Sequence, residues 1–233
     1  MNLLQIVQQA MQELGLASPN AVASSSDTTV LQFKALLNGL GQDLVKAHDW
    51  QVLQKEHTFN TASGTASYAL PSDFDRILDS TQWDRANAWP MSGPKTPQQW
   101  QEYKSGIVTS AGIHKRFRIK GNLFYIDPTP TATEASVFEY IQDTWATDVL
   151  GTTYKTTMDT DTDIPLLDDR LLVKGLKYYF YDAKGFDSAS LYDAFNKMYS
   201  AVTGHDGGAP VLSMDGCKLD RLSVNYPETN YGA

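Results

Sequence analysis

Residues 26–50 carry an apolar pattern that predicts a long amphipathic helix, and this helix constrains the fold most. Large apolar residues recur at spacings of four, three and four, at Phe33, Leu37, Leu40 and Leu44. Side chains at these spacings share one face of an α-helix. Ser26 or Asp27 can accept hydrogen bonds from the free N–H groups at its start. Because a helix of this length is marginal alone in water, its apolar face must pack on another part of the chain.

Both ends of the chain carry further helical patterns. Residues 3–14 predict a short amphipathic helix. Residues 166–184 predict a helix that is apolar around most of its circumference, which is typical of a helix buried on more than one side. Gly185 separates it from another helix that begins at Ser188 and stops at the glycines of 204–208.

The middle of the chain predicts short strands instead. Period-two alternation marks extended segments at residues 55–60, 67–70, 74–83, 116–120, 123–127 and 136–145. The clearest hairpin is joined by Gly121-Asn122, which fits a tight turn, and residues 61–64 predict another hairpin between the first two segments. Thr96-Pro97 predicts the start of a helix of two turns. Residues 151–165, rich in Thr and Asp, predict an exposed loop.

The order of these patterns predicts an α+β fold. We expect a helical bundle built from both ends of the chain, residues 1–54 and 158–204, with an antiparallel β-domain inserted at residues 55–157. Residues 205–233 lack a sustained period and predict an extended C-terminal arm. The sequence leaves open whether the β-domain closes as a barrel or stays a sandwich.

Composition narrows the function classes. A formal charge of −8 argues against a surface that coats nucleic acid, because neutralising phosphates needs clustered Lys and Arg. The single cysteine, Cys217, cannot form an internal disulfide. No run of residues is long and apolar enough to predict a membrane span, and no basic residue precedes the apolar part of the N-terminus. We therefore expect synthesis in the cytoplasm, without a signal peptide and without membrane contact.

Two fragments resemble ligand-binding motifs only in part. Gly39 and Gly41 match the first half of a dinucleotide-binding loop, but they lie inside a predicted helix rather than after a strand. Three acidic residues alternate like calcium ligands of an EF-hand, at Asp159, Asp161 and Asp163. The glycine that such a loop requires is Ile164 and its closing carboxylate is Arg170, so a solvated acidic loop is the favoured interpretation. The four histidines are scattered, and we expect no metal, cofactor or catalytic residue.

One short segment concentrates positive charge. His114, Lys115, Arg116, Arg118 and Lys120 belong to an arm of the predicted Gly121-Asn122 hairpin. This is typical of a solvated strand face, and the alternative is a rim that contacts an acidic partner or DNA. The tryptophans are not interleaved with basic residues, so they predict core or interface anchors rather than a base-stacking surface.

Several blocks of the sequence resemble the head-to-tail adaptor (connector) proteins of tailed bacteriophages, especially those with short tails. The more specific blocks are LPSDFDRI at 70–77, WPMSGP at 89–94 and DGGAPVL at 206–212. They are accompanied by weaker matches at 29–59, 117–130, 137–141 and 161–187, in the order that the family has them.

The resemblance implies a structural component of the virion neck. Copies would form a dodecameric ring beneath the portal, extend the DNA channel and offer a platform to tail nozzle and fibre proteins. DNA would pass without sequence-specific binding. The family has no known active site, so the resemblance carries over no catalytic residue and no cofactor.

Candidate contact residues follow from surplus apolar surface and from the resemblance. The aromatic run 178–181 cannot all face one core from a single helix, so some of it should meet a neighbouring subunit or the portal. The expected portal or neighbour contacts are Tyr178, Tyr181, Asp206, Pro210, Val211, Leu212, Leu219, Leu222 and Tyr226. The expected tail-side or rim contacts are Trp89, Lys115, Arg116 and Arg118.

The alternative function is a carbohydrate-binding or hydrolytic tail protein. It would use the Trp-rich middle of the chain together with Asp73, Asp75 and Asp84.

Overall fold

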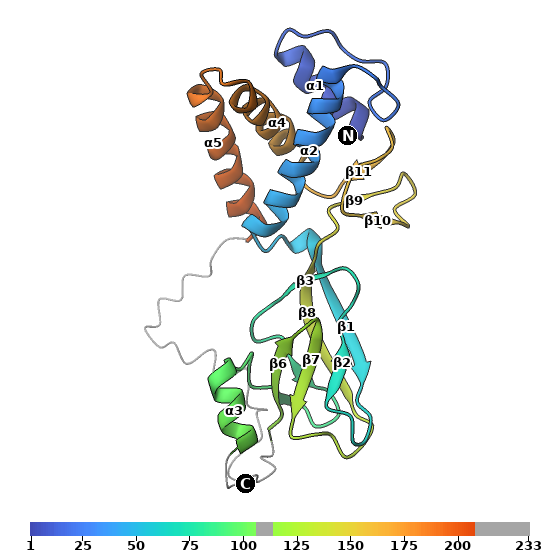
Figure 1. Cartoon of the computed structure of the whole chain (residues 1–233), viewed down its shortest axis with the longest axis vertical. Coiled ribbons are helices and arrows are strands. Elements are labelled where there is room, and N and C mark those ends of the chain that lie inside the picture. Colours follow the sequence, from blue (N-terminus) through green and yellow to red (C-terminus); the bar gives the residue numbers. More distant parts are fainter. Residues whose placement is uncertain (106–113, 208–233) are drawn as a thin grey trace, which may run out of the picture. The chain divides into compact units, whose positions relative to one another are not determined.

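The structure is a computed structural model that describes residues 1–105 and 114–207. Its described residues contain five α-helices and antiparallel strands, which confirms the mixed α+β class (Figure 1). They form two compact units. Of the described residues, the helical unit holds 1–55, 72–77 and 140–207, and the β unit holds 56–71, 78–105 and 114–139. The expected arm lies outside the described residues from 208 onward.

Four helices build the helical unit: α1 (Leu3–Glu13), α2 (Thr28–Ala47), α4 (Asp169–Lys184) and α5 (Ala189–Asp206). Asp27 caps α2 by accepting a 2.7 Å hydrogen bond from the Thr29 N–H, which confirms one of the two predicted caps. Asp168 caps α4 in the same way. Gly185 ends α4 in the left-handed conformation at φ 71°, which a residue with a side chain rarely adopts.

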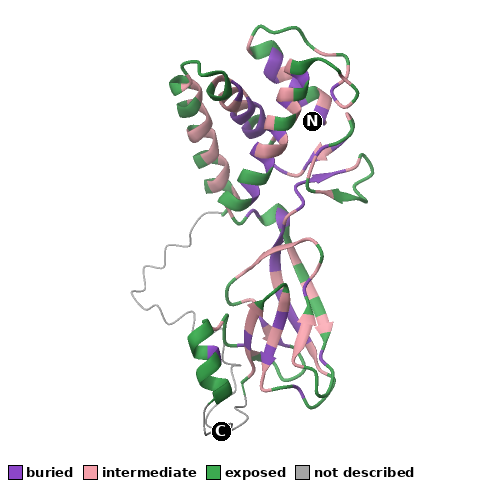
Figure 2. Ribbon diagram, viewed as in Figure 1, coloured by how far each residue is buried: buried purple, intermediate pink, exposed green. Residues whose placement is uncertain are grey.

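The core of the helical unit lies where α2 faces α1 and α4, as the buried stripes in Figure 2 show. The predicted stripe of α2 is buried, and the ring of Phe33 stacks on Phe180 with 4.3 Å between ring centroids. Trp145 is also fully buried and packs against the backbone at Gly41. The stripe read from residues 26–50 is therefore the centre of this core.

Helix α5 is covered on one side only. It packs on α4, yet none of its residues is buried. It ends at Asp206 with Gly207 as its C-cap, within the glycines of 204–208 that were predicted to stop it. The Asp206 carboxylate holds this end by accepting from the Gln51 N–H at 3.1 Å and by pairing with His48 Nε2 at 3.1 Å.

A small three-stranded sheet belongs to the helical unit, in the order β10 (Tyr154–Lys155), β9 (Ala146–Thr147), β11 (Ile164–Pro165). The prediction of an exposed loop at 151–165 is therefore wrong. Asp163 is only 1% exposed and folds the turn before β11 by accepting from the Asp159 and Thr160 N–H groups and from Lys155. Of the acidic residues read as solvated, Asp161 and Asp163 are hydrogen-bonded to the backbone and Asp159 is exposed.

The β unit contains the hairpin that the sequence predicted. β6 (Arg116–Lys120) pairs with β7 (Leu123–Asp127) in the expected register. Gly121 and Asn122 both have positive φ, at 57° and 59°, as a type I′ turn requires. β2 (Ser67–Ala69) borders β7 on its other side.

The other predicted hairpin is wrong. β1 (Gln54–Asn60) lies beside β8 (Ala135–Gln142), not beside β2. Residues 61–64 bond to residues 130–134 instead, through the Thr61 N–H to the Glu134 carbonyl and the Gly64 N–H to the Pro130 carbonyl.

The segment read as one strand at 74–83 is also two strands, β3 (Phe74–Ile77) and β4 (Trp83–Asp84), separated where Ser80 has a φ of 64°. β4 pairs with both β8 and β5 (Trp89–Pro90), and β3 pairs with the last residues of β8.

Stacked phenylalanines form the centre of the β unit. Phe124 lies between Phe117 and Phe138, with ring centroids 5.0 and 5.2 Å apart and planes within 10°. α3 (Pro97–Ser105) begins as predicted, because Thr96 Oγ1 accepts from the Gln99 N–H and the Gln99 side chain accepts from the Thr96 N–H.

Within the ranges 1–105 and 114–207, no helix combines the length and the apolar character that crossing a bilayer requires.

Candidate interaction surfaces

The four consecutive aromatic residues of α4 point in different directions. Phe180 enters the core, and the Tyr179 hydroxyl donates to the Asp43 carboxylate at 3.0 Å. Tyr178 packs against α5, with 5.3 Å between the centroids of its ring and that of Tyr192. Tyr181 lies against Phe186, with 5.6 Å between ring centroids. The two tyrosines expected to make contacts, Tyr178 and Tyr181, are thus half-exposed at the surface of α4.

Two of these aromatics, Tyr178 and Tyr179, line a groove between α4 and α5, which we call the aromatic groove. Its volume is about 470 Å³. Its lining residues are Leu36, Tyr178, Tyr179, Asp182, Ala183, Tyr192 and Phe195. Tyr192, which lines the groove, is 46% exposed, and Phe186, outside it, is 58% exposed. Burial, together with the Asp43 carboxylate, raises the pKa of Tyr179 to about 12, so its hydroxyl remains a neutral donor at physiological pH.

A second apolar feature of the helical unit was missed by the sequence analysis. Val149 and Leu150 lie in the loop between β9 and β10 and are 63% and 78% exposed. Their sequence signal is an aliphatic pair between Asp148 and Gly151, inside a Thr-rich stretch that reads as a polar loop. We call these two residues the aliphatic tip.

The basic cluster of the hairpin is neutralised in part within the β unit, at Lys115 and Arg116. The Lys115 amine is 2.7 Å from Asp84 and also contacts Glu134, and its side chain is 12% exposed. Burial lowers the pKa of Lys115, but the hydrogen bonds to Asp84 and Glu134 outweigh it, and the pKa lies above its usual value. Lys115, which directly precedes β6, therefore links the start of this strand to Asp84 in β4 and to Glu134 just before β8 rather than presenting its charge.

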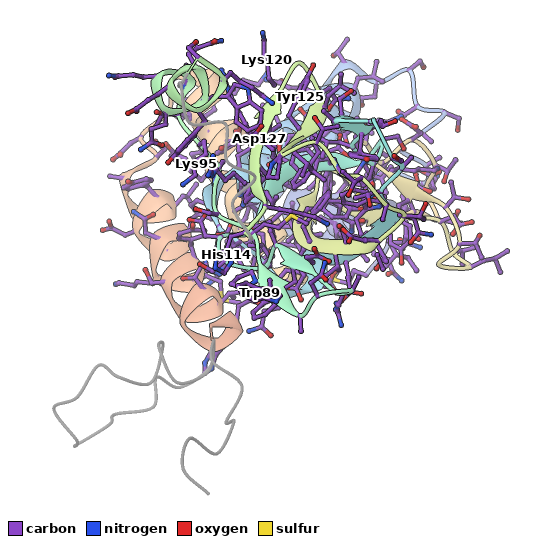
Figure 3. The ribbon with its side chains drawn as sticks, turned by 90° about the horizontal axis from the view of Figure 1, so that it is seen from below. Trp89, Lys95, His114, Lys120, Tyr125 and Asp127 are labelled. Atoms are coloured by element: carbon purple, nitrogen blue, oxygen red, sulfur yellow. The ribbon has the colours of Figure 1, made fainter. Side chains whose placement is uncertain are left out.

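Arg116 is engaged in a similar way. Its guanidinium lies 4.1 Å from the centre of the Tyr103 ring in α3, and its Nη1 is 3.5 Å from Asp127. Lys104 adds a 2.6 Å bond to the same carboxylate. Figure 3 shows Asp127 and Tyr125 on β7 and Lys120 at the end of the hairpin.

Two of the four expected rim residues remain at the surface. Trp89 is 36% exposed, and its ring centroid lies 4.3 Å from that of His114. Figure 3 shows the two labelled residues close together. Arg118 is half-exposed and lies opposite Tyr125 in the hairpin register.

The carboxylates of the alternative, hydrolytic interpretation are held in ion pairs. Asp73 pairs with Lys55 at 2.7 Å and Asp75 with Arg76 at 2.6 Å, both in the helical unit. Asp84 belongs to the β unit and pairs with Lys115.

The acidic EF-hand-like segment is likewise occupied by protein donors. Asp161 accepts from the Val22 and Ala23 N–H groups at 2.9 and 2.7 Å, and Asp163 accepts as described above. In the part of the chain that the structure describes, no group of three or more His, Cys, Asp or Glu residues could hold a metal ion.

The expected contacts near the C-terminus divide at residue 208. Asp206 is part of α5, where its carboxylate and carbonyl bind His48 and Gln51. The others lie outside the described residues: Pro210, Val211, Leu212, Leu219, Leu222 and Tyr226.

Comparison with known proteins gives one informative match. No curated protein matches the chain. A family model described as SU10 adaptor protein matches residues 1–211, which is most of the 233-residue chain. This agrees with the resemblance to bacteriophage head-to-tail adaptors carried by the 70–77, 89–94 and 206–212 blocks. The chain belongs to the SU10 adaptor protein family.

Proposed function

We propose that this chain is the structural head-to-tail adaptor of a bacteriophage virion. Its copies form a dodecameric ring below the portal protein, extend the DNA channel and provide the platform to which tail nozzle and fibre proteins attach. The observation that carries the proposal is the family match over residues 1–211. The working location is the virion neck, after synthesis in the cytoplasm of the bacterial host.

Unsatisfied apolar surface on the helical unit supports an assembly role. The aromatic groove and the aliphatic tip leave large apolar side chains in water on a single copy. Such patches on soluble proteins mark interaction sites, and aromatic residues are enriched in the buried centres of interfaces. We assign Tyr178 and Tyr181 to contacts between neighbouring copies.

The remaining contact residues keep the roles expected from the sequence. Residues 208–233, with Pro210, Val211 and Leu212 at their start, are assigned to the portal. Trp89 and Arg118 are assigned to the tail side, because their side chains reach the surface of the β unit while those of Lys115 and Arg116 are held by carboxylates.

The charge of the chain suits a conduit. A formal charge of −8, with Lys115 and Arg116 neutralised internally, leaves little to attract phosphates. A strongly basic lumen would retain DNA through counterion release, whereas an acidic one lets it pass.

Reconstitution with the portal protein of the same phage tests the proposal. The purified chain is mixed with portal rings, sedimented and imaged by electron microscopy. We expect a second ring on one face of the portal and co-sedimentation in a fixed ratio. Chains that stay monomeric and remain in the supernatant at micromolar concentration would contradict the proposed function.

A further inference from the structure

The outer face of the β6–β7 hairpin collects positive charge. Side chains alternate across a strand, so the buried Phe117 points toward the phenylalanine core of the β unit. Three alternate positions of β6 therefore share the opposite face, and all of them are basic: Arg116, Arg118 and Lys120. Tyr125 of β7 lies on this face too, directly opposite Arg118 in the pairing register. The hairpin thus carries a row of cations on the side that faces away from its core.

The segment that leads into α3 adds another cation to this row. The Lys95 N–H donates to the Phe117 carbonyl at 3.0 Å, so this segment runs beside β6. The Lys95 amine lies 5.8 Å from the centre of the Tyr103 ring in α3, the same ring that the Arg116 guanidinium approaches to 4.1 Å. Figure 3 shows Lys95 close to Asp127 of β7. Lys95 therefore belongs to the same surface as the cations of β6.

Carboxylates neutralise only part of this surface. Asp127 is shared between Lys104 at 2.6 Å and Arg116 at 3.5 Å, so one carboxylate serves two cations. Glu102, on the exposed side of α3, is the other carboxylate nearby. The cations of this surface that form no ion pair within residues 1–105 and 114–207 are Lys95, Arg118 and Lys120. We call the surface formed by these three cations with Tyr103 and Tyr125 the basic face.

The aromatic residues of the basic face favour a protein as its partner. Tyr103 is 37% exposed, and Tyr125 is half-exposed beside Arg118. Tyrosine and arginine are enriched among the residues that contribute most of the binding energy in protein interfaces. A guanidinium can also donate two parallel hydrogen bonds to one carboxylate, which fixes the geometry of the contact. The composition of the face therefore fits a protein surface that presents Asp or Glu.

Duplex DNA fits the same face less well. A protein gains affinity for DNA by neutralising phosphates, roughly one for each cation, and the basic face has three unpaired cations. The chain as a whole carries a formal charge of −8, which repels a polyanion at longer range. A protein partner needs fewer ion pairs, because burial of the tyrosine rings adds to the contact.

We propose that the basic face binds an acidic segment of the tail nozzle protein, with Arg118 pairing with a carboxylate of that segment and Lys95 and Lys120 attracting it from either side. This inference rests on the proposed function, because it names the chemistry by which the tail side of the adaptor recognises its partner. Charges at the rim of an interface act mainly on the rate of association and are screened by salt. Binding of the nozzle protein should therefore weaken as the ionic strength rises.

Charge reversal in the full-length chain bound to portal rings tests the contact. The rings are immobilised, and the nozzle protein of the same phage is passed over them at low and at high ionic strength. We expect Arg118→Glu to weaken binding at least tenfold at low ionic strength, mainly through slower association. Arg118→Lys, which keeps the charge but loses the planar fork, should lie between wild type and Arg118→Glu. The matched control is Arg85→Glu, at an exposed arginine of the β unit that pairs with Glu56 outside the basic face, and it should bind as wild type does.

A second variant and two polyanions make the test independent of the fold around Arg118. Lys120→Glu changes an exposed side chain at the end of the hairpin, so the melting temperature of the free chain should not change, and nozzle binding should weaken in the same direction. Poly-L-glutamate should compete with the nozzle protein for wild-type rings. Duplex DNA at the same charge concentration should compete less well, because the face is argued to select carboxylates.

The outcomes separate the contact from the function. Rings that form on the portal and bind the nozzle protein equally well with wild type, Arg118→Glu and Lys120→Glu would refute the contact and leave the adaptor function standing. Duplex DNA that binds the rings more tightly than poly-L-glutamate, in a manner abolished by Arg118→Glu, would assign the face to DNA and also refute the contact. Wild-type chains that neither form rings nor bind the portal would remove the proposed function, and the contact with it.

Discussion

At the scale of single residues, two glycines of α2 serve different purposes. A Cβ at Gly41 would lie 2.3 Å from the ring of Trp145, which is fully buried, whereas a Cβ at Gly39 would meet nothing within 4 Å. We expect Gly41→Ala to destabilise the protein by roughly 1–3 kcal/mol through overpacking. Gly39→Ala, on the same helix, should stabilise it by roughly 0.5–1 kcal/mol. Urea denaturation of both variants measures the difference, and equal effects would show that Trp145 does not rest on α2.

The sequence does not indicate the structural role of Lys115. Its amine pairs with Asp84, whose side chain is 4% exposed, and removing it leaves that carboxylate buried without its cation. We therefore expect Lys115→Met to cost about 3–5 kcal/mol, as the loss of one member of a buried pair does. Lys120→Met, at the exposed end of the strand β6 that follows Lys115, should change stability by less than about 0.5 kcal/mol. Thermal unfolding followed by near-ultraviolet circular dichroism compares the two, and a mild effect of Lys115→Met would mean that solvent reaches Asp84.

Asp143 provides a prediction in which a substitution stabilises the protein and the effect depends on pH. Burial and the nearby carboxylates of Asp73 and Asp75 raise the pKa of Asp143, and its Oδ1 atom is buried without a hydrogen bond. In the unfolded chain the group ionises near its ordinary pKa, so its ionisation opposes folding as the pH rises above about 4. Asp143→Asn should therefore stabilise the protein at pH 7 and have little effect at pH 3. Urea denaturation at the two pH values measures this difference, and an Asp143→Asn effect independent of pH would contradict the assignment.

At the scale of elements, the sequence predicted what depends on neighbouring residues. Helix starts at Asp27 and Thr96, the stop at Gly185 and the Gly121-Asn122 turn are confirmed, because caps and tight turns are satisfied within a few residues. The strand pairings failed where the partner is distant. The sequence of residues 61–64 does not indicate that N–H groups of this segment bond to residues 130–134.

The candidate contact surfaces divide in the same way. Four consecutive aromatic residues at 178–181 predicted that some of them are exposed, because they cannot all face one core from a helix. The structure places Tyr178 and Tyr181 at the surface. Lys115 could not be separated from Arg118 by charge pattern, because the carboxylates that hold Lys115 come from residues 84 and 134. Exposure of Val149 and Leu150 depends on a turn in which the Asp148 carboxylate accepts from the Thr152 N–H. A Thr-rich stretch of sequence does not indicate this turn.

The turn at 159–163 carries a prediction at this scale. Asp163 organises the turn and its carbonyl accepts from the Leu3 N–H, so this turn also anchors the start of α1. Asp163→Ala should cost about 2–4 kcal/mol, because several buried donors lose their acceptor at once. Asp159→Ala, at an exposed side chain, should cost less than about 0.5 kcal/mol. Calcium should not raise the melting temperature of the wild-type chain, because the acceptor oxygens are taken by protein donors. A rise on adding millimolar calcium would reopen the EF-hand interpretation.

At the scale of the whole molecule, residues 1–55 and 143–207 form the helical unit together with two short segments from the middle of the chain. Residues 72–77 and 140–142 join the helical unit through the pairing of β3 with β8. That pairing is long-range, so periodicity alone could not place these segments. A chain divided in this way can keep one unit folded when a terminal segment is removed, provided that the cut leaves the helix ends intact.

The position of Asp206 decides where such a cut belongs. Deletion from 205 would remove the carboxylate that holds α5 to His48 and Gln51, whereas deletion of residues 208–233 keeps it. We expect the 1–207 chain to unfold at the same temperature as the whole chain and to lose co-sedimentation with the portal, because its proposed portal contacts begin at Pro210. The Lys120→Met chain is the matched control: it keeps residues 208–233, so it should still bind the portal. Portal binding by the 1–207 chain at wild-type strength would place the portal contact within the described helices instead.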